Sequence, residues 1–211
     1  MLELFFIILL VIASIVGMTF IVERGLALRT QKVVPSEVED AVTSFHANGD
    51  LGYLQDTCQH YPSPLSRLLL LAAEHRQWPK ADNAEALQTK ARHEIVKLER
   101  GLVILEIVVG IAPLLGLVGT IYGLIMLFGG MGQEDIGSGG SQVAAGIALA
   151  LRATLMGLLT AIPSLIAWSY FNKKVETMAV EMENVCALFL RRLYRDKNHV
   201  ATDKNHSRTV I

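Results

Sequence analysis

The sequence predicts an all-α membrane protein with three transmembrane helices. Hydrophobic residues make up 52% of the 211 residues and charged residues only 18%, and the mean hydropathy is +0.40. This composition is too apolar for an ordinary soluble domain of this length. Three runs with almost no charge, at 4–22, 107–132 and 143–172, are each near or above the roughly 20 residues that a helix needs to cross a bilayer.

The distribution of Lys and Arg predicts the orientation, because cytoplasmic flanks of spanning helices carry the excess of positive charge. Basic residues follow the first run, precede the second and follow the third, whereas the N-terminal residues and the linker at 129–142 contain none. We therefore expect the N-terminus outside and the C-terminus in the cytoplasm. The first run has no basic stretch before it and no small-residue cleavage site after it, so we expect a retained anchor instead of a secretory signal.

The segments between and after the spans are predicted to be helical. Pro and Gly break residues 23–101 into short helices, which indicates a small cytoplasmic domain between the first and second spans. Apolar residues recur at spacings of three and four from Val175 to Leu193, so the third helix should extend into the cytoplasm. The second helix should likewise continue from the cytoplasmic segment before it, since no further breaker lies between Asp82 and Arg100.

These patterns divide the chain into seven segments. They are the first transmembrane helix at 1–22, the cytoplasmic helical domain at 23–101, the second transmembrane helix at 102–128, a periplasmic linker at 129–142, the third transmembrane helix at 143–172, its cytoplasmic extension at 173–195 and a disordered tail at 196–211.

Composition argues against several classes of function. The net charge is −1, and no basic and aromatic cluster suggests a nucleic acid partner. Cys58 and Cys186 both fall in predicted cytoplasmic segments, where thiols stay reduced. Cys58 and His60 alone fall short of a zinc pattern. Since no nucleophile and base pair or phosphate loop appears either, we predict no catalytic residue, no metal and no cofactor.

Small residues recur along the second and third spans at the spacing that lets membrane helices approach closely. They are Gly116, Gly119 and Gly123 on the second span, and Ala153, Gly157 and Ala161 on the third. Pro113 and Pro163 interrupt the backbone hydrogen bonding of the same two helices. Close packing of these helices against each other and against further copies is the expected result.

Arg152 is a charge inside the third apolar run. An ionisable residue at membrane depth costs about 2.5–3.5 kcal/mol on insertion scales, so a polar partner or a function must compensate. If the linker is symmetric, Thr120 lies near the height of Arg152 and Thr154, which favours a polar lining near mid-membrane. Glu106 lies roughly 20 Å from Thr120 along its helix, too far for direct pairing with Arg152.

Several fixed motifs in the second and third spans resemble the ExbB/TolQ branch of the MotA/TolQ/ExbB proton-channel family. They are Leu105-Glu106, the run IAPLLGLVGT at 111–120, Gly146-Ile147-Ala148, Ala153-Thr154, Gly157-Leu158 and Ala161-Ile162-Pro163. The layout of three spans with a large cytoplasmic loop is also similar to that branch.

The resemblance implies an inner-membrane stator, a homopentamer in the lipid bilayer around the membrane helices of an ExbD/TolR-like single-span partner. In the family, an aspartate of this partner carries the proton, and a TonB- or TolA-like protein transmits the work. Thr120 and Thr154 correspond by motif to two threonines that line the proton route. The family carries a glutamate where this chain has Leu149, and Arg152 follows three residues later on nearly the same helical face.

Arginine cannot carry the proton, since its pKa stays above about 12. The resemblance therefore places the proton-carrying carboxylate on the partner, and two interpretations of Arg152 remain open. In one, Arg152 pairs transiently with the partner's aspartate; in the other, it fixes assembly through carbonyls or hydroxyls between subunits. Two alternatives to the ion-driven motor also remain open: a non-conducting membrane scaffold of the same fold, and an anion-permeable pore lined by Arg152.

Overall fold

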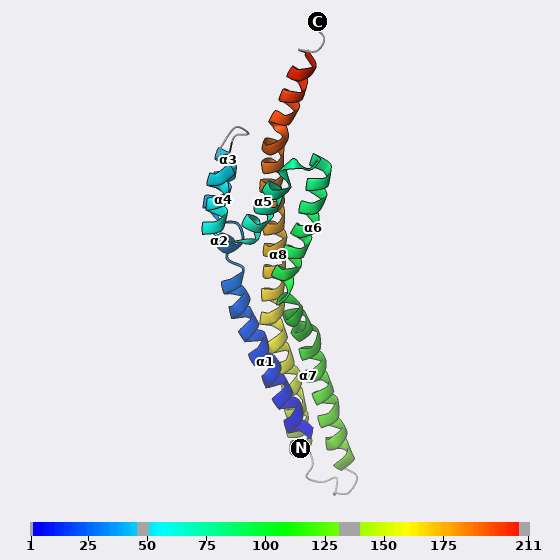
Figure 1. The fold of residues 1–211 in the computed structure, drawn as a ribbon. Helices are drawn as coiled ribbons and strands as arrows, with labels where there is room; N and C mark the ends of the chain where they lie inside the picture. Colours follow the sequence, from blue (N-terminus) through cyan, green and yellow to red (C-terminus); the bar gives the residue numbers. More distant parts are fainter. Residues whose placement is uncertain (1, 46–50, 131–139, 207–211) are drawn as a thin grey trace. The chain divides into compact units, whose positions relative to one another are not determined.

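The computed structural model describes residues 2–45, 51–130 and 140–206 (Figure 1), and every element within these ranges is a helix. The helices are α1 (Leu2–Ala27), α2 (Thr30–Val33), α3 (Ser36–Ser44), α4 (Leu51–His60), α5 (Pro64–Glu74), the 3-10 helix η1 (His75–Gln77), α6 (Lys80–Glu99), α7 (Leu102–Gly130) and α8 (Gly140–His206). They form two compact units. The membrane unit comprises Met1–Leu26 and Arg100–Asn172, and the helical unit comprises Ala27–Glu99 and Lys173–Ile211.

The membrane unit confirms the predicted number of spanning helices. Three helices are long and apolar enough to cross a membrane, at Phe5–Ala27, Leu102–Gly129 and within Val143–Arg195. At most 28% of the most apolar part of any of them is buried inside the chain. Lipid or other protein chains must therefore cover most of this apolar surface.

Helix α1 packs against α7 and α8 through small side chains. Gly17 faces Ser164 of α8 and Val108 of α7, which lie 3.0 and 3.4 Å from the position that a Cβ on Gly17 would take. Further along, Leu10 of α1 packs with Ala112 of α7 and Ala161 of α8, and all three are buried. In Figure 1, α1 and α7 accordingly lie beside the first part of α8.

The helical unit is held by the apolar stripe predicted on the extension of the third helix. Met178, Met182 and Phe189 of α8 are all at most 1% exposed, and the Phe189 ring lies 5.4 Å from that of Phe45. Arg192 of α8 also donates hydrogen bonds to carbonyl oxygens at the end of α3, including that of Phe45 at 2.8 Å. The stripe is therefore a packing surface within the unit.

The entry into the second span differs from the predicted continuous helix. Helix α6 ends at Glu99 and α7 begins at Leu102, with a turn at residues 100–101. A Cβ on Gly101 would lie 2.5 Å from Cζ and 2.8 Å from Cδ of Arg24. Glycine at this turn thus lets the arginine of α1 lie against the backbone.

The predicted tail also differs from the structure, because α8 continues to His206. Residues 196–206 contain no Gly or Pro that would end the helix. Residues 207–211 of the predicted tail, and residues 131–139 of the predicted linker, lie outside the described residues.

Helices α5 and α6 are joined by an ion cluster around one buried carboxylate. Glu94 is 1% exposed and accepts hydrogen bonds from Arg67 at 2.5 Å and from Lys97 at 3.1 Å. Lys90 lies 4.0 Å from the same carboxylate. Burial alone raises the pKa of Glu94, but the hydrogen bonds and charges of Arg67 and Lys97 outweigh burial and lower it.

We expect Glu94→Gln to destabilise the chain at pH 7 by about 1–3 kcal/mol, because Arg67 and Lys97 lose their bonds to an ionised carboxylate. Arg67 is half-exposed, so water compensates part of its loss. The pKa of Glu94 is lower in the folded than in the unfolded chain. The stabilisation is therefore complete above the ordinary carboxyl pKa of about 4.3 and is lost as the pH falls through the lowered value. Chemical denaturation of the purified chain at pH 7 and pH 3 measures the difference.

The exposed Glu99 near the end of the same helix provides the control. Glu99→Gln should change the free energy of unfolding by less than about 0.5 kcal/mol at either pH. An equal loss of stability for Glu94→Gln at pH 7 and at pH 3 would contradict a role for the ionised carboxylate.

The two cysteines lie in the helical unit. Both are buried, and they form no disulfide with each other. Burial raises the pKa of the Cys58 thiol to about 11, although a hydrogen bond with Ser66 acts in the opposite direction. Cys58 is therefore a protonated, unreactive thiol at neutral pH.

Candidate functional site

The membrane parts of α7 and α8 touch through their backbones. A Cβ on Gly157 would lie 2.6 Å from the carbonyl oxygen of Ala112 and 3.2 Å from Cα of Gly116. A Cβ on Gly116 would lie 2.8 Å from the carbonyl oxygen of Ala153. Real Cβ atoms do not approach backbone atoms this closely, so glycine is required at both positions for this helix spacing.

The same helix face continues with two further glycines. A Cβ on Gly119 would lie 3.0 Å from Cβ of Ala153, and a Cβ on Gly123 would lie 3.1 Å from Cβ of Ala150. These contacts are with methyl groups instead of backbone, so they tolerate small shifts. The tightest approach of the two helices is therefore at Gly116 and Gly157.

Thr120 and Thr154 meet at this tight approach. The Thr120 hydroxyl lies 3.1 Å from the carbonyl oxygens of Gly116 and Ala150, and it is hydrogen-bonded to the Thr154 hydroxyl. The Thr154 hydroxyl also lies 3.3 Å from the Gly116 carbonyl oxygen. Thr120 is 8% exposed, whereas Thr154 is partly exposed.

The two hydroxyls have only two protons between them, and both can be used inside the chain. In one arrangement Thr154 donates to Thr120, which donates to Ala150; in the other Thr120 donates to Thr154, which donates to Gly116. Either way, the Thr154 oxygen keeps at least one unused lone pair. The threonine pair can therefore accept a hydrogen bond from an outside group.

Arg152 does not join the threonine pair. It is exposed, and no described residue forms a hydrogen bond or ion pair with it. Because each residue of a helix advances about 100°, Arg152 leaves α8 about 200° away from Thr154. Leu149 is also exposed, at 52%, and it lies about 60° from Arg152 on the same side.

Two further hydroxyls of the span bind their own helix. Thr160 donates to the carbonyl oxygen of Met156 at 3.0 Å, and Ser164 donates to that of Thr160 at 2.9 Å. Hydroxyls in apolar helices commonly satisfy themselves in this way. They are structural, in contrast to the bonds that link Thr120 to α8.

Both prolines lie inside continuous helices, Pro113 in α7 and Pro163 in α8. Each removes the backbone donor that would bond to the carbonyl four residues earlier. The two prolines therefore mark the points at which α7 and α8 bend most easily, seven residues before Thr120 and nine residues after Thr154.

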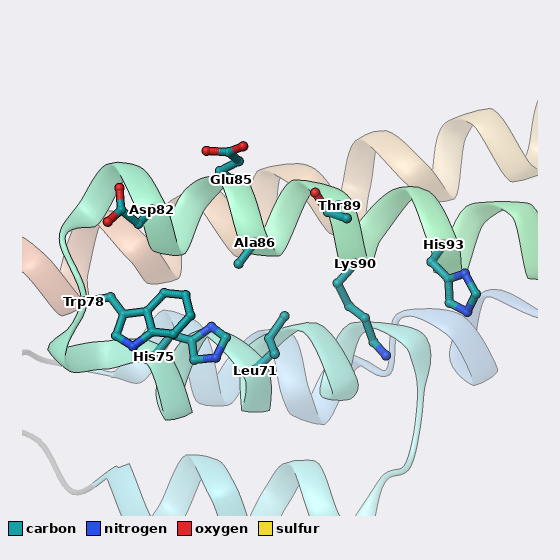
Figure 2. A pocket seen from close by; sticks show the side chains of 9 residues that line it. All are labelled: Leu71, His75, Trp78, Asp82, Glu85, Ala86, Thr89, Lys90 and His93. Atoms are coloured by element: carbon teal, nitrogen blue, oxygen red, sulfur yellow. The ribbon is translucent and has the colours of Figure 1, made fainter.

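The helical unit contains a separate hollow of about 670 Å³ between α5, η1 and α6. Its lining residues are Leu71, His75, Trp78, Asp82, Glu85, Ala86, Thr89, Lys90 and His93. His75 and Trp78 stack at 3.9 Å, while Asp82 and Glu85 point away from Leu71 (Figure 2). The described residues include no group of three or more His, Cys, Asp or Glu that could hold a metal.

The sequence model described as the MotA/TolQ/ExbB proton channel family matches residues 62–184, which include the threonine pair, Arg152 and the whole of α7. The chain belongs to this family. It is 30% identical over 208 residues to the Tol-Pal system protein TolQ of Pseudomonas aeruginosa, covering 92% of this chain and 88% of TolQ. It is 33% identical over 106 residues to the biopolymer transport protein ExbB of Aquifex aeolicus, covering 50% of this chain and 70% of that protein. These similarities confirm the ExbB/TolQ branch.

Three groups at the contact between Thr120 and Thr154 were not predicted from the sequence. The carbonyl oxygens of Gly116 and Ala150 accept from the threonines, and Ala112 lies opposite Gly157. The spacing of Ala112, Gly116 and Thr120 at four-residue intervals could have indicated Ala112. No sequence signal identifies the carbonyls, because backbone acceptors occur at every residue.

Proposed function

We propose that this chain is the stator subunit of a motor driven by the proton motive force in the inner membrane. A homopentamer surrounds the membrane helices of an ExbD/TolR-like partner, and a TonB- or TolA-like protein transmits the work to transport or to the cell envelope. The linker after α7 faces the periplasm, and the C-terminus faces the cytoplasm. Family membership and the distribution of Lys and Arg support this proposal.

The threonine pair is the observation that carries the proposal. Thr120 lies ten residues before Gly130, the last residue of α7, which is about 15 Å along the helix and therefore near the middle of a bilayer core of about 30 Å. A pair of hydroxyls with open lone pairs at this depth is suited to accept a proton-bearing group. Apolar packing alone has no need of a hydrogen bond between α7 and α8.

An acidic side chain of the partner carries the proton. Glu23 and Glu106 are the acids of the membrane unit whose side chains the structure describes, and neither reaches the threonines. Glu106 lies fourteen residues from Thr120, or about 21 Å along α7, and Glu23 pairs with Arg24 at 2.5 Å. Leu149, at the position of the family glutamate, cannot titrate.

Purification and reconstitution test the proposal. The chain is to be co-expressed with the ExbD/TolR-like protein of its own organism, purified, and reconstituted in liposomes with a pH-sensitive dye inside. We expect the two proteins to co-purify and to conduct protons when an inward proton gradient and potential are imposed. Liposomes with either protein alone provide the control.

The same liposomes separate the alternatives. A non-conducting scaffold predicts co-purification with a leak no greater than that of empty liposomes, and an anion pore predicts a current that falls when gluconate replaces chloride. If the flux requires a sodium gradient, the driving ion is sodium instead of the proton.

A further inference from the structure

Glu106 is a carboxylate inside the second apolar span. The span begins at Leu102, so Glu106 lies four residues, or about 6 Å, inside it. Its side chain is exposed, and no hydrogen bond or ion pair joins it to a residue that the structure describes. Ionisable side chains in membrane helices face protein or a water-filled cavity and pair there. The position of Glu106 therefore points to a cation from another molecule.

The basic residues of the membrane unit do not supply this cation within one chain. They are Arg24, Arg100 and Arg152. Arg152 lies about 24 Å from the depth of Glu106 when the threonine pair is used to align the two helices. Arg24 pairs with Glu23 at 2.5 Å, and its side chain is only 15% exposed. Arg100 lies outside the span, in the turn before α7.

A second copy of the chain offers exposed bases near its cytoplasmic ends. Copies related by an axis along the membrane normal hold each residue at the same depth, so Arg100 of a second copy lies close to the cytoplasmic end of the span. Lys173 is also exposed, although it already pairs with Glu176 at 2.8 Å. These bases are the alternative to a cation from a different protein.

Glu106 lies on a side of α7 that α1 leaves open. Val108 faces Gly17 of α1, and it leaves α7 about 200° away from Glu106. Leu117 leaves the helix within about 20° of Glu106 and is 49% exposed. This side of α7 is therefore free for a molecule other than its own α1.

The same side of α7 leads to the threonine pair. Glu106, Pro113 and Thr120 are spaced seven residues apart, so successive members differ in direction by only about 20°. Thr120 is hydrogen-bonded to Thr154, which is partly exposed. A straight helix lying along this side would span the distance from Thr120 to Glu106, about 21 Å, with about fourteen residues.

The membrane helix of a single-span partner carries cations in the right place for a general reason. Lys and Arg that flank a span set its orientation and remain on the cytoplasmic side. Their long side chains bury apolar stems while the charged ends reach polar groups. Glu106 lies about 6 Å inside the span, a depth that an extended Lys or Arg side chain covers from the membrane surface. The charges are therefore complementary at this depth.

We propose that Glu106 binds a Lys or Arg on the cytoplasmic flank of the partner's membrane helix and thereby sets the depth of that helix in the ring. The ion pair keeps the partner's acidic group level with the threonine pair and opposes sliding of the helix along its axis. The inference rests on the proposed function, because it concerns the same ExbD/TolR-like partner.

The probe is a synthetic, N-acetylated peptide of the partner's membrane helix with its cytoplasmic flank. Its control is the same peptide with each Lys and Arg of the flank replaced by Gln. Binding to the purified full chain in phosphatidylcholine nanodiscs, whose lipids carry no net charge, is measured by fluorescence. We expect the wild type to bind the basic peptide about tenfold more tightly than the Gln peptide. Glu106→Gln should lose this preference, and Glu106→Asp should keep part of it.

Charge reversal sharpens the test. Glu106→Lys should prefer a peptide with Glu in place of each flanking Lys and Arg over the basic peptide. The exposed Glu99 near the end of α6 is the matched control, and Glu99→Gln should retain the full preference. If Glu106→Lys does not fold, the Gln and Asp variants still decide the outcome.

Three results would overturn the proposal. The first is a wild type that does not prefer the basic peptide. The second is an equal loss of preference in Glu99→Gln and Glu106→Gln, which would indicate a diffuse negative surface. The third is a Glu106→Gln variant that binds both peptides equally weakened, as expected if Glu106 pairs with a base of a second copy.

Proton flux through the complex with the natural partner is a separate readout. Flux without a preference for the basic peptide would reject the role of Glu106 and leave the proposed function intact. The preference without flux would reject the proposed function and keep Glu106 as a binding residue.

Discussion

Replacing Gly157 with alanine should destabilise the membrane unit and abolish proton conduction. The new methyl group would lie 2.6 Å from the carbonyl oxygen of Ala112 and 3.2 Å from Cα of Gly116, and backbone atoms cannot rotate away. Overpacking of this kind costs about 1–3 kcal/mol. Separation of α7 from α8 also lengthens the hydrogen bonds of Thr120. The unfolding temperature of the purified chain and the proton flux through the complex should therefore both fall.

Gly110 is the matched control on α7, because a Cβ at this position has no neighbour within 4 Å. Alanine is a better helix former than glycine by about 1 kcal/mol, so Gly110→Ala should leave the stability of the chain unchanged or raise it slightly. The two substitutions thus have opposite expected signs. Equal effects at the two positions would show that α7 and α8 do not touch as described.

Replacing Thr154 with valine should reduce proton conduction by about tenfold or more while the fold remains intact. Valine keeps the shape of threonine and removes the hydroxyl oxygen that has an unused lone pair. Thr120 can still donate to Ala150 at 3.1 Å, so no buried donor loses its acceptor, and the change in stability should stay within about 1 kcal/mol. Proton flux and thermal unfolding, measured on the same preparation, separate the two effects.

Thr160 provides the control for this prediction, because its hydroxyl binds only the carbonyl of Met156 in its own helix at 3.0 Å. Thr160→Val should conduct as the wild type does. Thr154→Ser should retain most of the flux. A Thr154→Val complex with normal flux would remove the threonine pair from the proton route.

The sequence was sufficient for the features that depend on local pattern. Long apolar runs are helices in any membrane fold, because the backbone must satisfy its own hydrogen bonds in lipid, and the three spans were predicted for that reason. The small residues spaced three or four apart, Gly116, Gly119 and Gly123 on the second span and Ala153, Gly157 and Ala161 on the third, likewise indicate close packing. Thr120 and Thr154 were identified by the motifs in which they occur.

The direction of side chains around each helix was not predicted, although Thr120 and Thr154 were expected at similar heights and are hydrogen-bonded to each other. Thr120 and Arg152 were placed at similar heights, but height alone does not give direction, and Arg152 leaves α8 on another side from Thr154. The break between α6 and α7 was missed because a single glycine in a polar helix is often tolerated. At the break, Gly101 lies against Arg24, which is 77 residues away in the sequence.

The hydroxyl network is complete within a single copy of the chain. All of its donors and acceptors, from Gly116 to Thr154, belong to one chain. Each copy therefore completes its acceptor site as it folds, and the cost of ordering the site precedes any encounter with a partner. In a ring, every position would present the same preorganised site, so an asymmetric partner could step from one copy to the next without choosing a starting point.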